Sequence, residues 1–595
     1  MGNRKTVSIA VAVLLALATV APAAASPGAQ TTSRRTLSLE QAKKMASGPR
    51  SALFDDDDWA TEFISGTVTP DGGLWQDAWV AAIAIHDDGG GWEAAGTGEV
   101  ASDGTYRIGL WAGPGTYRVA FFDMGNVYED VYYKDALTPE AGTDVAVAAG
   151  QTVTGIDQTL TPLPETMIAG NVYFEGAPPP PPGSVEVVGM QYLYDAEEGA
   201  WDWWWVSFNT VKADGSYRLH LRSPGTYRVG FWDYTGAFAE VYYKDAADVE
   251  SATDVSVDET GTTVAGIDQT MTVVPSKVLA GKNRYATAAA VSREAFPEEF
   301  YGTVVLATGE NWPDALVASP LAGVSWAPLL LTRKGSLPGE TLNEILRLQP
   351  FEVVIVGSYD AVSLATEVNL RLLSDVPVVR RLNGRDRYET AALVAHETLA
   401  RMWEETADGA IVVSGETYAD AMAAGPPAVW TGTPILLTRK DTLPAVTARW
   451  LKKRKVSETL VVGGTAAVGK GVAAQLPDVT RVGGRNRYGT AVALARHSAS
   501  EYGMSTQMFG VASGEDFPDG LVAGPLLGWQ GRCLLLMRAW QPSGETLSFL
   551  GSSEVAGLTF FGGEAALAPW VVDELLDAAG LPPVYGWDDG DWDDF

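Results

Sequence analysis

Cationic side chains recur at fixed places in the C-terminal half of this chain, and they are the residues best suited to binding chemistry. Each of three copies of one segment carries an arginine followed by tyrosine, and later a basic residue that follows a leucine-rich run. The first set is Arg284, Arg387 and Arg487, and the second set is Arg333, Lys334, Arg439, Lys440 and Arg538. Such groups bind phosphates and carboxylates through charge-assisted hydrogen bonds. The sets therefore predict anion binding, while ion pairs of the first set with Glu310, Glu416 and Glu515 are an equally good structural interpretation.

A Gly-Glu-x-x-x-Asp segment in each copy raises the alternative of an acidic active site. Its aspartates are Asp314, Asp420 and Asp519, and the residues three positions earlier are Asn311, Thr417 and Asp516. The earlier residues are all good helix N-caps, and an aspartate suits the first turn of a helix. A residue that carries a catalytic proton would not tolerate exchange among asparagine, threonine and aspartate. We therefore favour helix capping over catalysis.

The sequence offers no other catalytic constellation. The four histidines, His86, His220, His396 and His497, do not have the spacing of metal ligands, and no phosphate-binding loop or dinucleotide fingerprint is present. The single cysteine, Cys533, replaces a proline at the start of an apolar run, which favours a place in the core. These features predict a chain that is not an enzyme, with no catalytic residue, no metal and no cofactor.

The cationic residues belong to three tandem copies of one unit. The copies open with Gly281-Lys282-Asn283-Arg284-Tyr285, Gly384-Arg385-Asp386-Arg387-Tyr388 and Gly484-Arg485-Asn486-Arg487-Tyr488. From Arg284 to Arg387 is 103 positions and from Arg387 to Arg487 is 100. This period is too long for a solenoid unit and suits a small α/β module with its own core.

The joint pattern of these copies resembles the cell-wall-binding repeat of type 2, found in threes on secreted proteins of Gram-positive bacteria. It comprises an Arg-Tyr-x-Thr-Ala opening, a Gly-Glu-x-x-x-Asp-Ala segment, a Pro-Ile-Leu-Leu-Thr run and a Val-Gly-Gly turn, and it covers residues 277–583. The resemblance implies non-covalent attachment to an anionic cell-wall polysaccharide. In that family the leucine run is implicated in polymer binding, which carries over to Leu330, Leu331, Leu436 and Leu437. The third copy departs from the pattern, with Met537 for Thr332 and Ala539 for Lys334.

Apolar strands and helices alternate within each copy. In the first copy we expect helices at 286–296, 314–325, 339–348 and 362–373, and strands at 303–308, 328–332 and 352–356. This order predicts a parallel sheet with helices on both faces. Residues that follow strand ends line a crevice in such sheets, where we expect the cations to lie. Three similar copies are also expected to share equivalent interfaces around a pseudo-threefold axis.

The N-terminal half contains a different duplication. Asp103-Gly104-Thr105-Tyr106 matches Asp214-Gly215-Ser216-Tyr217, and Pro114-Gly115-Thr116-Tyr117 matches Pro224-Gly225-Thr226-Tyr227. Short alternating runs between Asp-Gly and Pro-Gly turns predict two antiparallel β-sandwiches. They resemble carboxypeptidase-regulatory-like or prealbumin-like modules. We expect this half to fold independently of the repeats.

Tryptophans cluster in both predicted sandwiches. The cluster in the second is Trp201, Trp203, Trp204 and Trp205, and Trp75, Trp79 and Trp92 occupy the corresponding part of the first. Since alternate residues of a strand share a face, we favour packing of Trp203 and Trp205 in the sandwich core. The alternative is an exposed aromatic face that stacks on sugar rings.

The N-terminal residues predict export from the cell, and the net charge limits the partners that the chain can bind. Residues 1–5 form a basic n-region with Arg4 and Lys5, residues 7–20 are an apolar run, and Ala23-Ala24-Ala25 suits cleavage of a signal peptide. The net charge of −32 divides into −22 for residues 1–275 and −10 for 276–595. Such an acidic chain is poorly suited to nucleic acid, and we expect neither a nucleic-acid partner nor a membrane anchor.

Together these observations predict a multidomain protein with two N-terminal antiparallel β-sandwiches followed by three α/β parallel-sheet repeats. The expected parts are a signal peptide (1–25), a linker (26–60), sandwich modules (61–163 and 164–275), repeats (277–379, 380–480 and 481–583) and an acidic tail (584–595). The predicted function is that of a secreted surface protein, held at the Gram-positive cell wall by the repeats. The alternatives are an adhesin or carbohydrate-binding protein that acts through the tryptophans, and a wall hydrolase with an unrecognised catalytic site.

Overall fold

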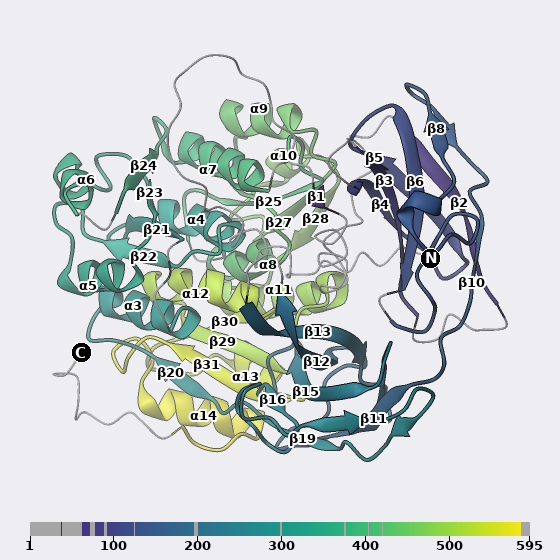
Figure 1. Ribbon diagram of the computed structural model, residues 1–595. Helices are drawn as coiled ribbons and strands as arrows, with labels where there is room; N and C mark the ends of the chain where they lie inside the picture. The colour runs from purple at the N-terminus through teal and green to yellow at the C-terminus, as the bar shows by residue number, and fades with distance from the viewer. Residues whose placement is uncertain are drawn as a thin grey trace.

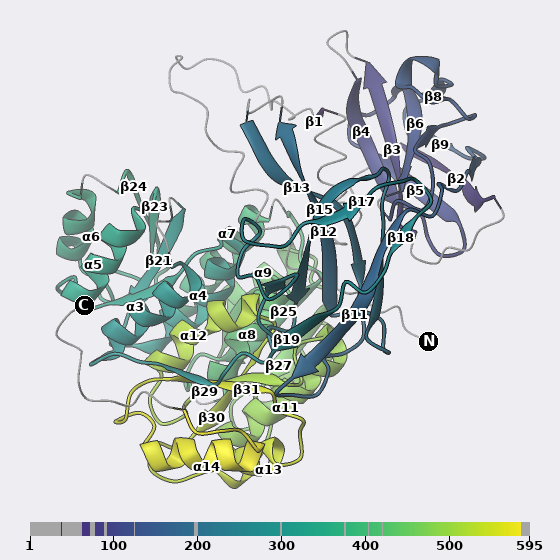
Figure 2. The same ribbon diagram turned by 60° about the horizontal axis from the view of Figure 1, so that its bottom comes forward.

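The computed structural model describes residues 62–584, apart from 72–77, 88–91, 124, 196–199, 298–299, 301, 374–375, 403 and 419, together with strand β1 (Leu37–Ser38). The predicted signal peptide, the predicted linker apart from β1, the predicted acidic tail beyond residue 584, and Trp75 lie outside the described residues. Figures 1 and 2 show two β-rich modules beside three α/β units, with sheets in the N-terminal part and parallel sheets in the repeats, as predicted.

The first module is one sheet in which most neighbouring strands run antiparallel. The exceptions among the described strands of this module are β9 and β10, which both pair with β2 in the parallel sense. In β5 the side chains of Tyr106 and Ile108 are buried while Thr105 and Arg107 are exposed, which is the period of a strand with one face on a core. The strands are β2 (Phe63–Pro70), β3 (Val80–Asp87), β4 (Trp92–Glu99), β5 (Thr105–Leu110), β6 (Gly115–Asp123), β7 (Val131–Tyr132), β8 (Val145–Val147), β9 (Thr152–Val153) and β10 (Gln158–Leu160).

The second module has two sheets that enclose a core containing Ile168, Val187 and Phe231. One sheet pairs β11 with β14, β18 and β19, and the other has the order β13-β12-β15-β16 with β17 beside β15. Among its described residues this core contains no tryptophan, so the interpretation of Trp203 and Trp205 as core residues is wrong. The strands are β11 (Met167–Glu175), β12 (Val185–Asp195), β13 (Ala200–Thr210), β14 (Ser216–His220), β15 (Gly225–Asp233), β16 (Val241–Tyr242), β17 (Val255–Val257), β18 (Thr263–Val264) and β19 (Gln269–Thr272).

Each repeat contributes to a four-stranded parallel sheet whose inner strands are buried, apart from the first residues of β25 and β27. The strands are β20 (Lys277–Leu279), β21 (Thr303–Thr308), β22 (Leu329–Thr332), β23 (Glu352–Val356), β24 (Val378–Leu382), β25 (Gly409–Ser414), β26 (Ile435–Thr438), β27 (Glu458–Val462), β28 (Val479–Val482), β29 (Met508–Ser513), β30 (Cys533–Met537) and β31 (Gly557–Phe561). The helices are α3 (Arg284–Ala295), α4 (Trp312–Val324), α5 (Gly339–Leu348), α6 (Leu364–Arg371), α7 (Arg387–Arg401), α8 (Gly425–Trp430), α9 (Ala445–Lys453), α10 (Lys470–Ala473), α11 (Arg487–Tyr502), α12 (Pro518–Trp529), α13 (Gly544–Leu550) and α14 (Pro569–Ala579).

The first strand of each repeat completes the sheet of another repeat. β24 pairs with β23, β28 pairs with β27, and β20, at the start of the first repeat, pairs with β31 of the third. In the last pairing Leu279 lies opposite Phe561, and the Gly562 N–H donates to the Leu279 carbonyl at 3.0 Å. The end of the third repeat is thus joined to the beginning of the first. No strand at 277–279 was predicted.

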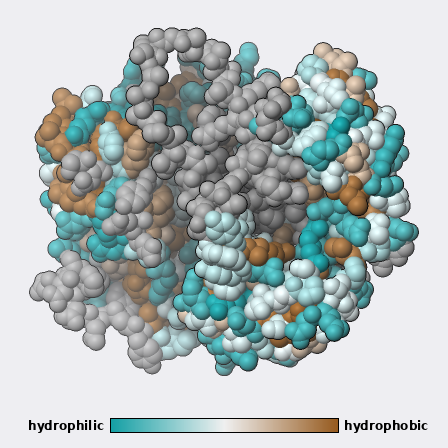
Figure 3. Space-filling model, viewed as in Figure 1, coloured by the Kyte–Doolittle hydropathy of each residue, from teal (hydrophilic) through white to brown (hydrophobic). Residues whose placement is uncertain are grey.

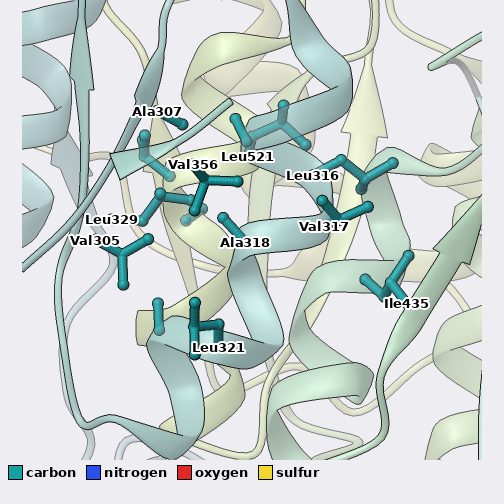
Figure 4. Packing of buried hydrophobic residues seen from close by; sticks show 14 of the residues in the cluster. Val305, Ala307, Leu316, Val317, Ala318, Leu321, Leu329, Val356, Ile435 and Leu521 are labelled. Atoms are coloured by element: carbon teal, nitrogen blue, oxygen red, sulfur yellow. The ribbon is translucent and has the colours of Figure 1, made fainter. Parts of the chain in front are cut away.

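Three equivalent helices, α4, α8 and α12, contact one another at the centre of the repeats. A small residue precedes a proline at the equivalent position of each repeat. These residues are Ser319, Gly425 and Gly524. A Cβ atom built on Gly524 would lie 2.8 Å from the Ser319 hydroxyl, so the helices can approach only because these residues are small. Figure 4 shows Leu316 and Leu321 of α4 in one apolar cluster with Ile435 and Leu521 from the other repeats.

The second module shares its core with the third repeat. Met508 and Ala556 belong to the same apolar cluster as Phe231, and a cavity of about 950 Å³ lies between the polyproline loop at 178–182 and α11. The Gln507 side chain donates to the Pro178 carbonyl at 3.2 Å, and Arg532 donates to the Gly236 carbonyl at 2.6 Å. These contacts contradict the expectation that the N-terminal half is independent of the repeats.

The surface carries an apolar stripe on α6 of the first repeat. Leu364 and Val368 of α6, and Leu372 directly after it, are exposed at a spacing of four residues. Figure 3 shows apolar side chains gathered at the upper left, where α6 lies in Figure 1. No helix within the described ranges has the length and apolar character needed to cross a bilayer.

Candidate functional site

The arginine and tyrosine of each opening motif are positioned by a helix N-cap. In the first repeat the Asn283 side chain accepts hydrogen bonds from the N–H groups of Tyr285 and Ala286, both at 3.0 Å. Asp386 and Asn486 cap α7 and α11. The cap fixes the first turn, so that arginine begins the helix and tyrosine is buried. Sequence reasoning missed these caps, although asparagine or aspartate precedes the arginine in every copy.

Each arginine of the first set bridges two repeats. Arg284 donates to the Gly309 carbonyl at 2.6 Å, and its guanidinium carbon lies 5.6 Å from the ring centroid of Phe517 in the third repeat. Arg387 and Arg487 donate to Gly415 and Gly514, and they lie over Trp312 and Tyr418 of the preceding repeat. The guanidinium groups of the first set therefore bind a carbonyl in their own repeat and a ring in another repeat, and these contacts stabilise the junctions between repeats.

The ion pairs expected for the first set are not formed. Among the described residues, Arg284 pairs with Asp516 at 3.1 Å, and neither Arg387 nor Arg487 lies within 4.0 Å of a carboxylate. The glutamates Glu310, Glu416 and Glu515 instead accept the backbone N–H of Lys334, Lys440 and Ala539, at 3.2, 3.0 and 3.0 Å. They hold the loop that follows each leucine strand.

The second set of cations lies on these loops at the carboxyl ends of the strands. In each repeat an arginine of this set lies over the buried tyrosine of the opening motif, at 5.4 Å for Arg333, 4.8 Å for Arg439 and 5.6 Å for Arg538. Arg333, Lys334, Arg439, Lys440 and Arg538 are all exposed. Ala539 is 7% exposed and offers no cation in the third repeat. The structure therefore brings the two sets together around Tyr285, Tyr388 and Tyr488, with the second set facing solvent.

The leucines implicated by family resemblance lie inside the sheets. Leu330, Leu331, Leu436 and Leu437 are at most 1% exposed. Direct contact of these side chains with a polymer is therefore not supported by the structure. What they provide is a fixed strand, from whose end the basic loop emerges.

The aspartates of the Gly-Glu segment lie at the junctions between repeats. Helix capping occurs as predicted in the first copy, where Asn311 caps α4, but Phe517 is the N-cap of α12, and in the second copy a short 3₁₀ helix (Met422–Ala424) precedes α8. Burial raises the pKa of Asp314 and of Asp519 to about 6. Asp420 accepts a hydrogen bond from Thr490 of the next repeat at 2.9 Å.

This geometry defines a repeat protein with exposed cationic loops, and comparison with known proteins identifies the repeat. The family model described as cell wall binding domain 2 matches residues 278–367, 381–473 and 481–572. Three segments of the C-terminal half thus match cell wall binding domain 2, as the resemblance predicted. The resemblance of the N-terminal modules to carboxypeptidase-regulatory-like sandwiches stays a prediction.

Two curated relatives come from Bacillus subtilis (strain 168). The chain is 32% identical over 299 residues to N-acetylmuramoyl-L-alanine amidase LytC, and 27% identical over 301 residues to the amidase enhancer. Each match takes in 50% of this chain, and they cover 58% and 40% of the relatives. The chain thus matches about half the length of these proteins.

The amidase relative contradicts the prediction that this chain is not an enzyme. The sequence-based exclusion of enzyme activity is therefore withdrawn. The match covers the cell-wall-binding region, so it gives this chain no catalytic residue.

Two solved structures from Clostridium difficile are also similar. Cwp6 has a TM-score of 0.48 and 18% identity, and the match covers 70% of this chain and 69% of Cwp6. Cwp8 has a TM-score of 0.47 and 18% identity, and the match covers 84% of this chain and 80% of Cwp8.

Proposed function

We propose that the exposed basic loops of the repeats hold this chain non-covalently at the Gram-positive cell wall by binding an anionic wall polysaccharide. The observation that carries the proposal is the pair of exposed cations after β22 and β26, each pair on a loop whose backbone is bonded to a glutamate. Guanidinium and ammonium groups fixed in this way can bind phosphate or carboxylate without reorganising the loop.

Local contacts must provide the attraction, because the whole chain is acidic. Its net charge of −32 repels a polyanion at long range. Binding by a few cations at short range predicts an affinity that falls with salt along a shallow slope.

The proposed architecture is a pseudo-threefold ring of repeats that displays two β-rich modules, the second of which is a two-sheet sandwich, with export directed by residues 1–25. The cyclic exchange of first strands and the mutual contacts of α4, α8 and α12 support the ring. The proposed domain boundaries are those predicted from the sequence.

Co-sedimentation of the full chain with purified cell walls tests the proposal. The variant R333A/K334A/R439A/K440A should bind at least about tenfold more weakly at low salt, with an unchanged melting temperature. The double variant R439A/K440A removes the two cations of one basic loop. Its matched control is K452A/K453A, which removes two exposed cations from the same repeat away from that loop. Undiminished wall binding by the fourfold variant would reject the basic loops as the contact.

A role in wall hydrolysis is the second candidate function, favoured by the 32% identity with a wall amidase. Release of soluble fragments from purified peptidoglycan by the full chain would support it. Intact peptidoglycan after prolonged incubation would reject it.

A further inference from the structure

The hairpin of β12 and β13 extends beyond the sheet to which it belongs. β15 pairs with β12 only from Val185 to Met190, whereas the pairing of β12 with β13 continues to Asp195 and Ala200. The outer part of the hairpin is therefore a two-stranded arm, which Figure 2 shows projecting past β15. A two-stranded ribbon alone is marginally stable in water, so contacts between its side chains matter.

One face of this arm consists of aromatic side chains. Tyr192 lies opposite Trp203 and Tyr194 lies opposite Trp201, which places all four on one face. We call these four residues the aromatic arm. The rings of Tyr192 and Trp201 are stacked, with centroids 5.8 Å apart and an angle of 21° between their planes. Trp201, Tyr194 and Tyr192 are 58%, 55% and 52% exposed, so this face is open to a ligand.

The first module lacks the arm but keeps the arginine at its base. Arg118 lies 4.6 Å from the ring of Trp92, as Arg228 lies 4.3 Å from the ring of Trp203. β3 ends opposite Trp92, where β12 continues past Trp203. The arginine and tryptophan pair thus belongs to the common module. The rings of Tyr192, Tyr194 and Trp201 have no counterpart among the described residues of the first module.

The charges around the rings favour a neutral ligand. Arg228, the cation that contacts the rings, is already paired with Asp254 at 2.8 Å and donates to the carbonyls of Val249 and Glu250. The N-terminal half carries a balance of −22, which disfavours a polyanion. The hydroxyls of Tyr192 and Tyr194 have no hydrogen bond to another described residue, so they are available to a polar ligand.

Sugar rings fit this combination of flat apolar rings and hydroxyls. A β-linked pyranose presents an apolar face of C–H groups that stacks on aromatic rings, and its hydroxyls can bond to the tyrosine hydroxyls. We propose that the aromatic arm binds a neutral polysaccharide of β-linked pyranose sugars, at a site separate from the basic loops of the repeats.

Calorimetric titration of the full chain with the hexamer of β-1,4-linked N-acetylglucosamine tests this proposal. The wild-type chain should bind it, and W201A/Y194A should bind at least about tenfold more weakly. W201F/Y194F keeps two rings in place and should stay within about threefold of the wild type. The control is W570A, which removes a tryptophan that is 48% exposed on α14, and its affinity should be unchanged.

Further outcomes separate this proposal from others. The variant R333A/K334A/R439A/K440A should bind the hexamer normally, which makes a failure of the basic loops distinguishable from a failure of the arm. No binding of the hexamer by the wild type, or equal binding by W201A/Y194A, would overturn the proposal. A wild-type dimer that becomes monomeric in W201A/Y194A would also overturn it, because the face would then belong to a second copy.

Discussion

The first two repeats and the third share one fold, and three of the corresponding positions at which the third departs from the other two are informative. After the leucine strand, Lys334 and Lys440 correspond to the buried Ala539. Before that strand, Ala327 and Thr433 correspond to Arg532, and in the strand that completes the sheet Arg381 and Arg481 correspond to Val278. None of these positions belongs to the buried leucines, which all three copies retain.

At two of these positions the third repeat makes contacts that the first two repeats do not make. Arg532 is 4% exposed and bonds to the second module, and Val278 packs against the apolar core of the third sheet where Arg381 and Arg481 donate to glycine carbonyls. Because the core of a repeat is independent of these edge positions, one copy can hold the displayed modules while the other two keep their paired cations.

Excising one repeat should have the largest effect. Residues 277–379 alone contain β20 without its partner β31, and residues 481–583 alone lack β20. Neither fragment should show a cooperative thermal transition by circular dichroism, because each leaves apolar strand and helix faces uncovered. A monomeric fragment 277–379 that melts cooperatively would show that strand exchange is not required.

Replacing Arg532 should weaken the docking surface that distinguishes the third repeat. Burial lowers the pKa of Arg532 to about 10, yet the side chain remains charged at neutral pH and donates to Gly236. Arg532→Ala should lower the free energy of unfolding by about 2 kcal/mol, since it removes a buried side chain and leaves the Gly236 carbonyl without its donor. Denaturant unfolding measures this loss, and Thr433→Ala, at the corresponding place in the second repeat, should change stability much less.

The junction between the third and first repeats should respond to pH. The pKa of Asp519 in the folded chain, about 6, exceeds its ordinary value of 3.8, so the folded state holds an extra proton between these values. Stability contributed by this group is therefore full at low pH and falls as pH rises through 6. Asp519→Asn should remove about 1 kcal/mol of the stability difference between pH 5 and pH 7.

Thermal melts at the two pH values measure the Asp519 effect. Asp360→Asn, at a fully exposed carboxylate, is the control. An unchanged pH dependence in Asp519→Asn would show that this carboxyl does not titrate in the folded chain.

The smallest expected effects concern the basic loop of the third repeat. Arg538→Ala should reduce wall binding by less than about twofold, because this loop carries one cation where the others carry two. Ala539→Lys should raise wall affinity about threefold at low salt, since the backbone of Ala539 is already bonded to Glu515 as in the other repeats. Co-sedimentation of both variants measures this, and a tenfold loss in Arg538→Ala would contradict the distinction between the repeats.

Local order was predictable from the sequence where long apolar runs leave few alternatives. Strands at 303–308 and 352–356 form as predicted, because each is a buried run bounded by turn residues. The pairing of β20 with β31 was not predictable, since Lys277–Leu279 is too short for a periodic signal and its partner lies at the far end of the repeats. Long-range pairing is decided by packing of whole repeats, which local patterns do not encode.

The sites show the same limit. Alternation correctly placed Trp203 and Trp205 on one face, but the position of the second sheet decides which face meets solvent. The cations of the second set lie at strand ends as predicted, because an apolar strand that ends in basic residues fixes where they emerge. Burial of Leu331 and Leu437 follows from the same apolar strands, whereas the family resemblance alone assigned these leucines to polymer binding.

Wall binding before and after removal of anionic polymers tests the central claim most directly. Purified walls are extracted with acid, and co-sedimentation of the full wild-type chain is measured on intact and extracted walls over a range of salt. Our account predicts strong binding to intact walls that weakens as salt rises, and loss of this salt-sensitive part on extracted walls. Equal affinity and equal salt dependence on both walls would contradict it.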